Sequence, residues 1–378
     1  MSKYIFDGYY GYKNVGDDVF CLIAEWGSRK YWKASSISFM SEELPQLHGP
    51  AKTVIPKERV FPGQKTVSKA LAVLSAKNYI FFGGSTLHSS QGRLLEILGN
   101  AAIKRLFDKK IAAIGVSIGP FKSMRSEMAI KGLLKKMDYI AVRDKRSFEI
   151  LRQMNIEVAA VKSFDPAVLM VDLMLDRQNI YVSPRKTQEK NGRKILGVSV
   201  CYFERYCGGD LKREKYRLET IKSVVERISA HGVTIRFFEF NGHKDFGDKK
   251  AIDEVAKSLG DAPGVELISY DSNPEKIFNK LRECDAVLGI RLHSAILAYT
   301  ADIPFMLVEY HRKCSDFLDE IDYSDEQRIG DASISIDEIA GKIENILEYP
   351  QDKKPWKLPL SEARIMALKN FTEAPFVS

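Results

Sequence analysis

Long hydrophobic runs are missing from this sequence. No stretch approaches the ~18 consecutive apolar residues that a membrane-spanning helix needs, so we expect no such helix. The opening Met1–Asp7 has no long apolar stretch behind Lys3, which is not typical of a signal peptide. Cysteine is also scarce, with five scattered residues, an odd number, and no CxxC pair. This usage predicts free thiols in a reducing compartment, and we expect a cytoplasmic protein.

Several familiar catalytic motifs are also missing. There is no GxGxxG, no P-loop Lys-Ser/Thr, no serine nucleophile elbow and no Cys–His arrangement. His243 with Asp245 and Asp248 comes nearest to a metal cluster, but this spacing fits no helix-borne ligand pair and hard metals need more carboxylates. We therefore expect no metal, and a loop that contacts substrate or solvent. The basic residues are spread out and match no RNA- or DNA-binding signature, which argues against a nucleic-acid partner.

The sequence does contain an excess of positive charge and enough length for two domains. It has 378 residues, with 57 Lys and Arg against 50 Asp and Glu, a net charge of +7. This balance favours anionic partners, such as phosphorylated substrates, and leaves open a peripheral role at an anionic membrane face. A length of 378 residues exceeds one ordinary core and suits two domains.

Apolar strand-like segments alternate with helix-like segments, and the alternation occurs twice. Helices are predicted over 19–26 and 92–107, for example, each after a strand-like run that ends in glycines. Such alternation predicts a parallel sheet with helices on both faces, which is an α/β fold. We expect an N-terminal domain over 1–175, a polar linker over 176–194, a second domain over 195–335, and helices over 336–378 that pack back on either domain.

The stretch Asp285–Tyr299 combines the strongest signals. It reads as an apolar strand ending in Gly289, a sharp turn with Arg291 and His293, and a helix that opens at Ser294. Ligands of open α/β sheets bind at such strand ends, and a helix N-terminus favours an anion. Arg291 can grip phosphate or carboxylate with two bonds, and His293 can transfer a proton near neutral pH. We interpret the turn as an anion site, the alternative being an ordinary helix cap beside an ion-paired arginine.

Other strand ends carry further candidates. Gly8–Asp18 is a glycine-bearing loop between the first strand and its helix, which is either a ligand loop or only a tight turn. The cationic run His311–Lys313 follows the strand next to Arg291, so the two strand tips are expected to be near neighbours. The carboxylates closest to strand ends are Asp17, Asp18 and Asp165. Each is a candidate general base, although a helix cap or a turn former explains them equally well.

Taken in order, these pieces resemble the polysaccharide pyruvyl transferase family. The matching segments are Gly8–Asp17, Gly83–Ser85, Gly115–Pro120, Val142–Asp144 with Ser147, Asp165–Ala167, Arg291–Ser294, Ile303-Pro304, Glu309-Tyr310 and Lys313. The resemblance implies two Rossmann-like domains that face each other across a cleft, as in GT-B enzymes. It also implies transfer of pyruvate from phosphoenolpyruvate to two hydroxyls of a sugar in a cell-surface polysaccharide or its lipid-linked precursor, forming a ketal. Phosphoenolpyruvate is then the donor substrate, and no cofactor is expected.

The resemblance also assigns residues. Those expected to bind phosphoenolpyruvate are Arg291, Leu292, His293, Ser294 and Lys313, with Arg205 as a displaced cation. Those expected to line the cleft are Asn14, Gly16, Gly83, Gly84, Ser85, His88, Glu309 and Tyr310. His293 would protonate either the methylene carbon or the leaving phosphate, Arg291 would hold the anion, and Asp17 is our choice of general base.

The sequence departs from the family at two positions. Cys201 and Tyr202 stand where the family often has an arginine, and His311 replaces a usual acidic residue. The alternative reading is a GT-B glycosyltransferase or other nucleotide-sugar enzyme that uses the same cleft. A third reading is a non-catalytic member that binds a glycan or a partner.

Overall fold

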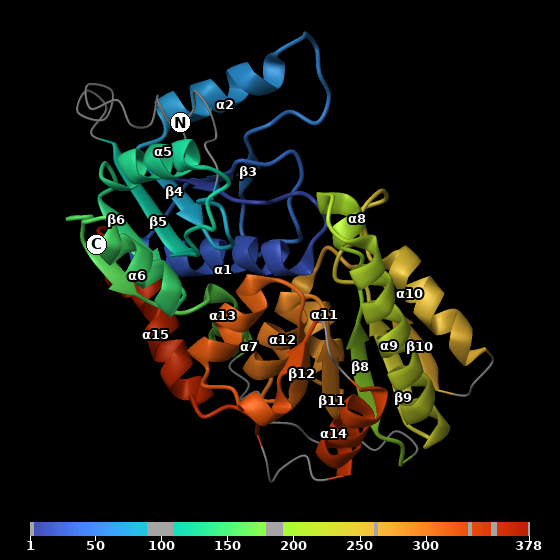
Figure 1. Cartoon of the computed structure of the whole chain (residues 1–378). Coiled ribbons are helices and arrows are strands. Elements are labelled where there is room, and N and C mark those ends of the chain that lie inside the picture. The colour runs from blue at the N-terminus through green and yellow to red at the C-terminus, as the bar shows by residue number, and fades with distance from the viewer. Residues whose placement is uncertain are drawn as a thin grey trace. The chain divides into compact units, whose positions relative to one another are not determined.

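The computed structural model describes residues 4–88, 109–178, 192–260, 264–331, 335–348 and 354–376 (Figure 1). The helix expected over 92–107 and most of the linker expected over 176–194 lie outside the described residues. The chain divides into two compact units, which we call the N-terminal unit and the C-terminal unit.

Each unit is built from more than one segment of the chain. The N-terminal unit comprises Met1–Tyr12, Asp17–Leu169 and Ser361–Ser378, and the C-terminal unit comprises Lys13–Gly16 and Met170–Leu360. The division therefore falls after Leu169, ahead of the segment expected as a linker. The 336–378 segment is also divided, because its first helix belongs to the C-terminal unit and its last helix to the N-terminal unit.

The N-terminal unit is built on a seven-stranded parallel sheet in the order β3-β2-β1-β4-β5-β6-β7. Its strands are β1 (Tyr4–Asp7), β2 (Ile37–Phe39), β3 (Lys52–Thr53), β4 (Asn78–Phe82), β5 (Lys110–Val116), β6 (Tyr139–Val142) and β7 (Ala160–Lys162). Its described helices are α1 (Val15–Trp32), α2 (Gln64–Ser75), α5 (Met124–Leu134), α6 (Lys145–Gln153), the 3-10 turn η1 (Pro166–Leu169) and α15 (Leu360–Thr372).

Alternating residues of β1 show that helices cover both faces of this sheet. Ile5 packs into a core shared with α2, α5 and α6. Tyr4 and Phe6 point the other way and stack with Trp32 of α1, which in turn contacts Phe371 of α15. This is the period-2 alternation of a strand buried on both sides, and it explains why β1 reads as a continuous apolar run.

The C-terminal unit contains a six-stranded parallel sheet in the order β10-β9-β8-β11-β12-β13. Its strands are β8 (Ile195–Ser199), β9 (Thr234–Phe238), β10 (Val265–Ile268), β11 (Ala286–Gly289), β12 (Phe305–Glu309) and β13 (Ile329–Gly330). Its described helices are α7 (Met170–Gln178), α8 (Glu204–Cys207), α9 (Leu211–Ala230), α10 (Lys249–Ala256), α11 (Pro274–Leu281), α12 (Leu292–Thr300), α13 (Arg312–Glu320) and α14 (Ile336–Glu348), with 3-10 turns η2 (Lys257–Leu259) and η3 (Asp325–Gln327).

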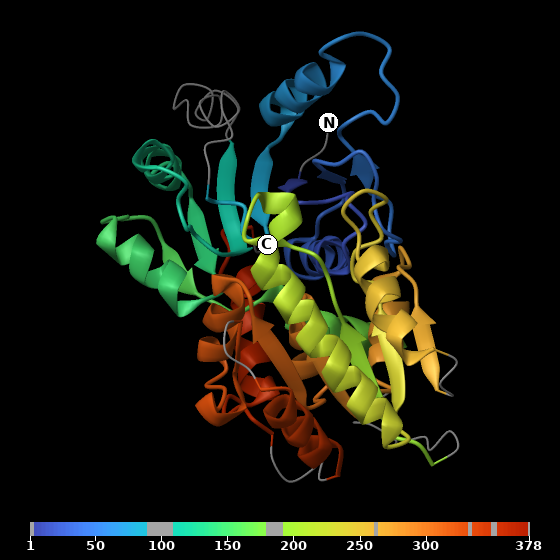
Figure 2. The ribbon, with the colours of Figure 1, turned by 45° about the vertical axis from the view of Figure 1, so that its right-hand side comes forward.

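Two parallel sheets, each packed with helices, confirm the expected α/β class with two Rossmann-like domains (Figures 1 and 2). β8 and β11 are central neighbours in the second sheet, so their carboxyl ends lie side by side. None of the helices in the described part of the chain is long and apolar enough to cross a membrane.

Candidate functional site

The turn after β11 is the centre of the candidate site. α12 begins at Leu292, two residues before the expected Ser294, and Arg291 takes the N-cap position. The Ser294 hydroxyl folds back and donates to the Arg291 carbonyl at 2.6 Å. A Cβ on Gly289 would lie 2.1 Å from that hydroxyl oxygen, so a larger residue at the strand end would displace the Ser294 hydroxyl. Arg291, Leu292, His293 and Ser294 therefore form one compact unit at a helix N-terminus.

Arg291 is held by Asp248, a carboxylate that the sequence did not single out as its partner. The Arg291 Nη2 and Nε atoms donate to Asp248 Oδ1 at 2.5 and 3.0 Å. Burial raises the pKa of Asp248, although Arg291 opposes the shift. Burial also disfavours the charge of Arg291, but Asp248 opposes this, and the pKa of Arg291 lies above its ordinary value. The cation is fixed in charge and in position.

Backbone bonds within the loop before α10 hold Asp248 in place. Asn241 N–H donates to Asp248 Oδ2 at 2.9 Å, and Asp248 N–H donates to the Asn241 carbonyl at 2.8 Å. His243 stacks on Phe246 with 3.4 Å between ring centroids, and its Nδ1 accepts from Asp245 N–H. Residues 244–246 of this loop are exposed to solvent, as expected for the loop, whereas the Asp248 side chain is buried against Arg291. Among the described residues, no group of three or more His, Cys, Asp or Glu could hold a metal ion.

The glycine-bearing loop near the N-terminus contributes directly to this site. Val15 N–H donates to the Phe240 carbonyl at 2.8 Å, and Gly242 N–H donates to the Lys13 carbonyl at 2.9 Å. The Asn14 side chain accepts from Gly16 N–H at 3.0 Å and so caps α1, a role that we had considered for Asp17 and Asp18. α1 consequently begins at Val15 instead of 19.

Gly16 lies against His293. A Cβ on Gly16 would come within 2.0 Å of the His293 Nδ1 atom. The expected site residues Asn14, Gly16, Arg291 and His293 are thus brought together within the C-terminal unit, although about 280 positions of sequence separate the two pairs.

Cys201 lies among the charges of this site. It is 1% exposed, and burial raises the pKa of its thiol to about 11, while Arg291 and Lys313 oppose the shift and Asp248 adds to it. The thiol is therefore neutral near pH 7. Arg291 and Lys313, the two cations expected to bind phosphoenolpyruvate, both lie close enough to influence this one thiol.

Arg217 is a further buried residue that the sequence reading missed. Its guanidinium donates to Glu204 at 2.6 and 3.1 Å and to Asp331 at 2.8 Å, and it lies 5.3 Å from the Tyr310 ring centroid. A signal was present, because the buried residues of α9 recur at helical spacing and include this arginine. An ionisable residue on a buried helical stripe predicts buried partners. Tyr310, which is 8% exposed, is thereby tied to the same cluster.

Two expected site residues are engaged elsewhere. Arg205 donates to Glu214 at 2.5 Å and lies 3.2 Å from the Tyr202 ring centroid. Both carboxylate oxygens of Glu309 accept from Arg328, at 2.9 and 2.7 Å. These bonds give Arg205 and Glu309 structural roles that the sequence did not suggest.

His311 caps the helix that carries Lys313. Its Nδ1 atom accepts from Lys313 N–H at 3.2 Å, at the start of α13. Burial, together with Lys313 and Arg312, lowers the pKa of His311 to about 4. The imidazole is therefore neutral near pH 7 and adds no charge beside Lys313.

The remaining expected residues lie at the carboxyl edge of the N-terminal sheet. Gly83 and Gly84 follow β4 with φ of 73° and 72°, a left-handed conformation that favours glycine. His88 Nδ1 lies 2.8 Å from the Ser85 carbonyl oxygen, and its ring lies 6.4 Å from the ring of Tyr9. Burial and, after it, the negative charge of Asp17 raise the pKa of Tyr9. Asp17 is half-buried in the first turn of α1. Asp17, Ser85 and His88 therefore gather around one sheet edge.

A buried ion pair links several motifs at this same edge. Arg143 Nη1 donates to Asp165 at 2.5 Å, and Arg143 Nε donates to the Ser117 hydroxyl at 2.8 Å. Ser117 in turn donates to Asp144 at 2.7 Å. Asp165 also accepts from Ala167 N–H at 2.9 Å, so the turn-forming alternative describes it better than the general-base alternative.

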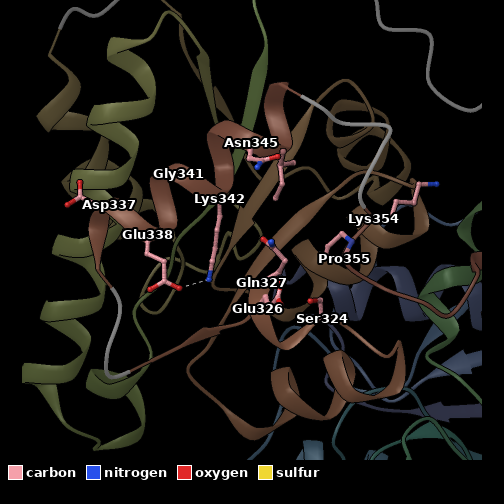
Figure 3. Close-up of a pocket in the computed structure, with 11 residues that line it drawn as sticks. Ser324, Glu326, Gln327, Asp337, Glu338, Gly341, Lys342, Asn345, Lys354 and Pro355 are labelled. Atoms are coloured by element: carbon pink, nitrogen blue, oxygen red, sulfur yellow. Dashed lines mark hydrogen bonds and ion pairs between the residues drawn. The ribbon is translucent and has the colours of Figure 1, made fainter.

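A pocket of about 490 Å³ lies elsewhere in the C-terminal unit, between η3 and α14 (Figure 3). The Lys342–Glu338 ion pair lies on its α14 side, and Gln327 and Lys354 also line it. η3 precedes β13, and Lys354 pairs with Asp302, which precedes β12, so the pocket lies at the amino edge of the sheet. Ligands of open α/β sheets bind at the opposite edge, and we do not assign the function to this pocket.

The solved structures that this chain resembles share its two-domain architecture. UDP-GlcNAc 2-epimerase from Methanocaldococcus jannaschii superposes with a TM-score of 0.60 at 13% identity, over 97% of this chain and 98% of that one. UDP-GlcNAc 2-epimerase from Neisseria meningitidis, bound to UDP-GlcNAc, gives 0.60 at 9% identity over 96% and 97%. Anabaena Alr3699/HepE in complex with UDP-glucose gives 0.55 at 12% over 98% and 96%. At these identities the likeness concerns the fold alone, which is GT-B-like.

Sequence comparison is more specific. The model of the family described as polysaccharide pyruvyl transferase matches residues 8–312. This range starts at the glycine-bearing loop and includes Gly83–Ser85, Arg143, Arg291 and His293. Because the match covers most of the chain and contains these motifs in order, the protein belongs to the polysaccharide pyruvyl transferase family.

Proposed function

We propose that this protein transfers pyruvate from phosphoenolpyruvate to two hydroxyls of one sugar, in a cell-surface polysaccharide or its lipid-linked precursor, and so forms a pyruvate ketal. Membership of the family supports a transferase that acts in polysaccharide biosynthesis. The observation that carries the finer proposal is the pairing of Arg291 with buried Asp248 beside His293, at the first turn of α12.

The donor requirements match the residues at this turn. Phosphoenolpyruvate carries a phosphate and a carboxylate, so it needs several donors and positive charge. A helix N-terminus supplies backbone N–H groups and a favourable dipole. Arg291 supplies a fixed fork and Lys313 a second cation, while the neutral Cys201 and His311 add no opposing charge. We assign donor binding to Arg291–Ser294 and Lys313.

The reaction needs proton transfer in both directions. A proton delivered to the methylene carbon makes C2 electrophilic, and a sugar hydroxyl attacks C2 while losing its own proton. A second hydroxyl then displaces inorganic phosphate from C2 and closes the ketal. His293 is our proton donor, because Gly16 and the α12 turn position its ring. Asp17, which follows Gly16 in the chain, is our general base for the hydroxyls.

The alternative is a nucleotide-sugar enzyme. The structures of the Neisseria epimerase and of Alr3699/HepE hold UDP-GlcNAc and UDP-glucose in the same fold. A nucleotide diphosphate would also suit a helix N-terminus with nearby cations. Whether the protein binds phosphoenolpyruvate or a UDP-sugar distinguishes the two hypotheses, and this test does not require a known acceptor.

The test is a thermal-shift titration with phosphoenolpyruvate, UDP-GlcNAc and UDP-glucose, on wild type, His293→Asn and Lys313→Ala. Lys249→Ala, an exposed lysine on α10, is the matched control. A ligand that binds only the folded state raises the Tm. At a ligand concentration a hundredfold above Kd, it adds about 2.7 kcal/mol to the free energy of unfolding. We expect phosphoenolpyruvate to stabilise wild type and Lys249→Ala, and to do so much less in Lys313→Ala. Stabilisation by a UDP-sugar alone would replace our proposal with the alternative.

A further inference from the structure

The positive charge of this protein is concentrated in two segments of the N-terminal unit. Residues 52–77 and 122–136 hold eleven Lys and Arg against two Asp and Glu, a local charge of +9. The net charge of the whole chain is +7, so the remaining residues together are slightly acidic. The two segments contain α2, the loop before it, and α5.

The same segments expose large apolar side chains. Val60 is 86% exposed and Phe61 47%, both in the loop before α2. Val67 and Leu71, four residues apart on α2, are 46% and 60% exposed. Met124 and Met128, four residues apart on α5, are 78% and 69% exposed. Residues four apart share one helix face, so each helix presents an apolar stripe outward among basic residues.

α2 and α5 share one side of the sheet. Ala72 and Val73 of α2 and Ile130 and Leu133 of α5 are buried in one core against the strands. Both helices therefore belong to the layer that covers this face of the sheet (Figures 1 and 2). The exposed apolar side chains of both helices lie on the outside of this layer. We call Val60, Phe61, Val67, Leu71, Met124 and Met128, with their surrounding basic residues, the α2–α5 surface.

The α2–α5 surface extends to the functional edge of the sheet. α2 follows β3 and leads to β4, and α5 follows β5 and leads to β6. In a parallel sheet such helices run from the carboxyl edge back to the amino edge. Phe61 and Met124, at or just before the first turns, accordingly lie toward the edge that carries Ser85 and His88.

We propose that the α2–α5 surface docks the protein on a bilayer that contains anionic phospholipid. The apolar side chains insert at the boundary between headgroups and acyl chains, and the surrounding Lys and Arg contact lipid phosphates. A lipid surface accommodates side chains that project singly from two helices and a loop, because it needs no shape-matched pocket. The excess of positive charge on this surface is complementary to the anionic headgroups.

Docking through this surface brings the carboxyl edge of the N-terminal sheet to the membrane, where a lipid-linked glycan would present its sugar. This consequence rests on the proposed function, whereas vesicle binding does not. If the wild type bound phosphoenolpyruvate but did not bind vesicles, the docking proposal would be wrong and the proposed reaction would still stand.

The experiment is co-sedimentation of the full chain with two kinds of vesicle, phosphatidylcholine alone and phosphatidylcholine with phosphatidylglycerol in equal parts. The apolar variant carries Phe61→Ser and Met124→Ser, and the charge variant carries Arg59→Glu and Arg125→Glu. The matched controls are Ile365→Ser, on an exposed position of α15, and Lys249→Glu, in the C-terminal unit. All substitutions are at exposed positions, and an unchanged Tm verifies that each variant is folded.

We expect wild type and both controls to bind the anionic vesicles and to ignore neutral ones. Both test variants should bind the anionic vesicles at least tenfold more weakly. High salt should release the wild type. The proposal is overturned if wild type fails to bind anionic vesicles, or if the apolar variant binds as tightly as Ile365→Ser.

Discussion

The guanidinium of Arg291 donates two hydrogen bonds to one oxygen of Asp248, whose side chain is completely buried. The pair joins the helix start at α12 to the loop before α10, across 43 positions of sequence. A buried charge is tolerated only when it is paired and hydrogen-bonded, and the second oxygen of Asp248 is satisfied by Asn241. Asp248 is thus a positioning residue for the arginine that we assign to the donor.

Asp248→Asn removes the negative charge beside Arg291 while it keeps the size of the side chain. Asparagine keeps the volume and one acceptor for Asn241, but it leaves the partly buried Arg291 cation without a carboxylate. We expect a loss of stability of about 3–5 kcal/mol. We also expect weaker phosphoenolpyruvate binding, because Arg291 is freed to turn away. Urea unfolding and the phosphoenolpyruvate-dependent Tm shift measure the two effects.

Asp245→Asn is the matched control, since Asp245 lies exposed in the same loop. It should change stability by no more than about 0.5 kcal/mol, as is usual for a surface substitution. Equal effects of the two substitutions would contradict a special role for the Asp248–Arg291 pair.

Gly16→Ala should reduce activity by displacing His293. Replacing glycine by alanine normally strengthens a helix by about 1 kcal/mol. Here the added Cβ would lie 2.0 Å from the His293 Nδ1 atom, so the imidazole must move. We expect kcat with phosphoenolpyruvate and a competent acceptor to fall by about a hundredfold, because small misplacements of a catalytic group have effects of this size.

The chain offers two helical glycines as controls for this substitution. A Cβ on Gly132 of α5 or on Gly341 of α14 meets nothing within 4 Å. Gly132→Ala and Gly341→Ala should therefore be neutral or slightly stabilising and leave kcat unchanged. A wild-type kcat in Gly16→Ala would show that His293 tolerates displacement and would remove our argument for its placement.

The strand β11 and the glycine that ends it were predictable from the sequence, but the start of α1 was not. β11 ends at Gly289 as expected, since an apolar run followed by glycine is a local signal. α1 starts four residues early because Asn14 caps it and because the Val15 backbone pairs with Phe240. That pairing depends on a partner far along the chain, which local periodicity does not reveal.

The ion-pair partners of the expected charged site residues could not be predicted from the sequence either. No spacing rule connects Arg291 to Asp248, Arg205 to Glu214 or Glu309 to Arg328, because each pair joins segments whose packing against one another local periodicity does not reveal. The sequence could identify these charged side chains but not the ion pairs that they form. Arg217 is the exception, since its place on the buried stripe of α9 was readable.

His311→Asn should flatten the pH dependence of stability between pH 6.5 and 4. The folded chain holds the pKa of His311 at about 4, whereas an unfolded histidine titrates near 6.5. In this window the unfolded chain binds more protons, so the free energy of unfolding falls as the pH falls, and the contribution is fully present above pH 6.5. We expect wild type to lose on the order of 2 kcal/mol more than the variant across the window. Asparagine still provides a cap acceptor for Lys313 N–H. Urea unfolding at several pH values measures the difference, and parallel curves would contradict a half-buried, neutral His311.

Native thiol labelling should modify Cys207 and spare Cys201. Of the five cysteines, Cys207 is exposed and the other four are buried. Burial raises the pKa of Cys201 to about 11, and thiolates are the reactive form, so access and ionisation both protect it. We expect iodoacetamide to add one group per folded chain and five in denaturant, with Cys207→Ser abolishing the native reaction. Rapid labelling of Cys201 in the folded wild type would mean that its thiol is ionised beside Arg291. An anionic sulfur there would compete with the donor phosphate for the same cations, and donor binding at this turn would have to be abandoned.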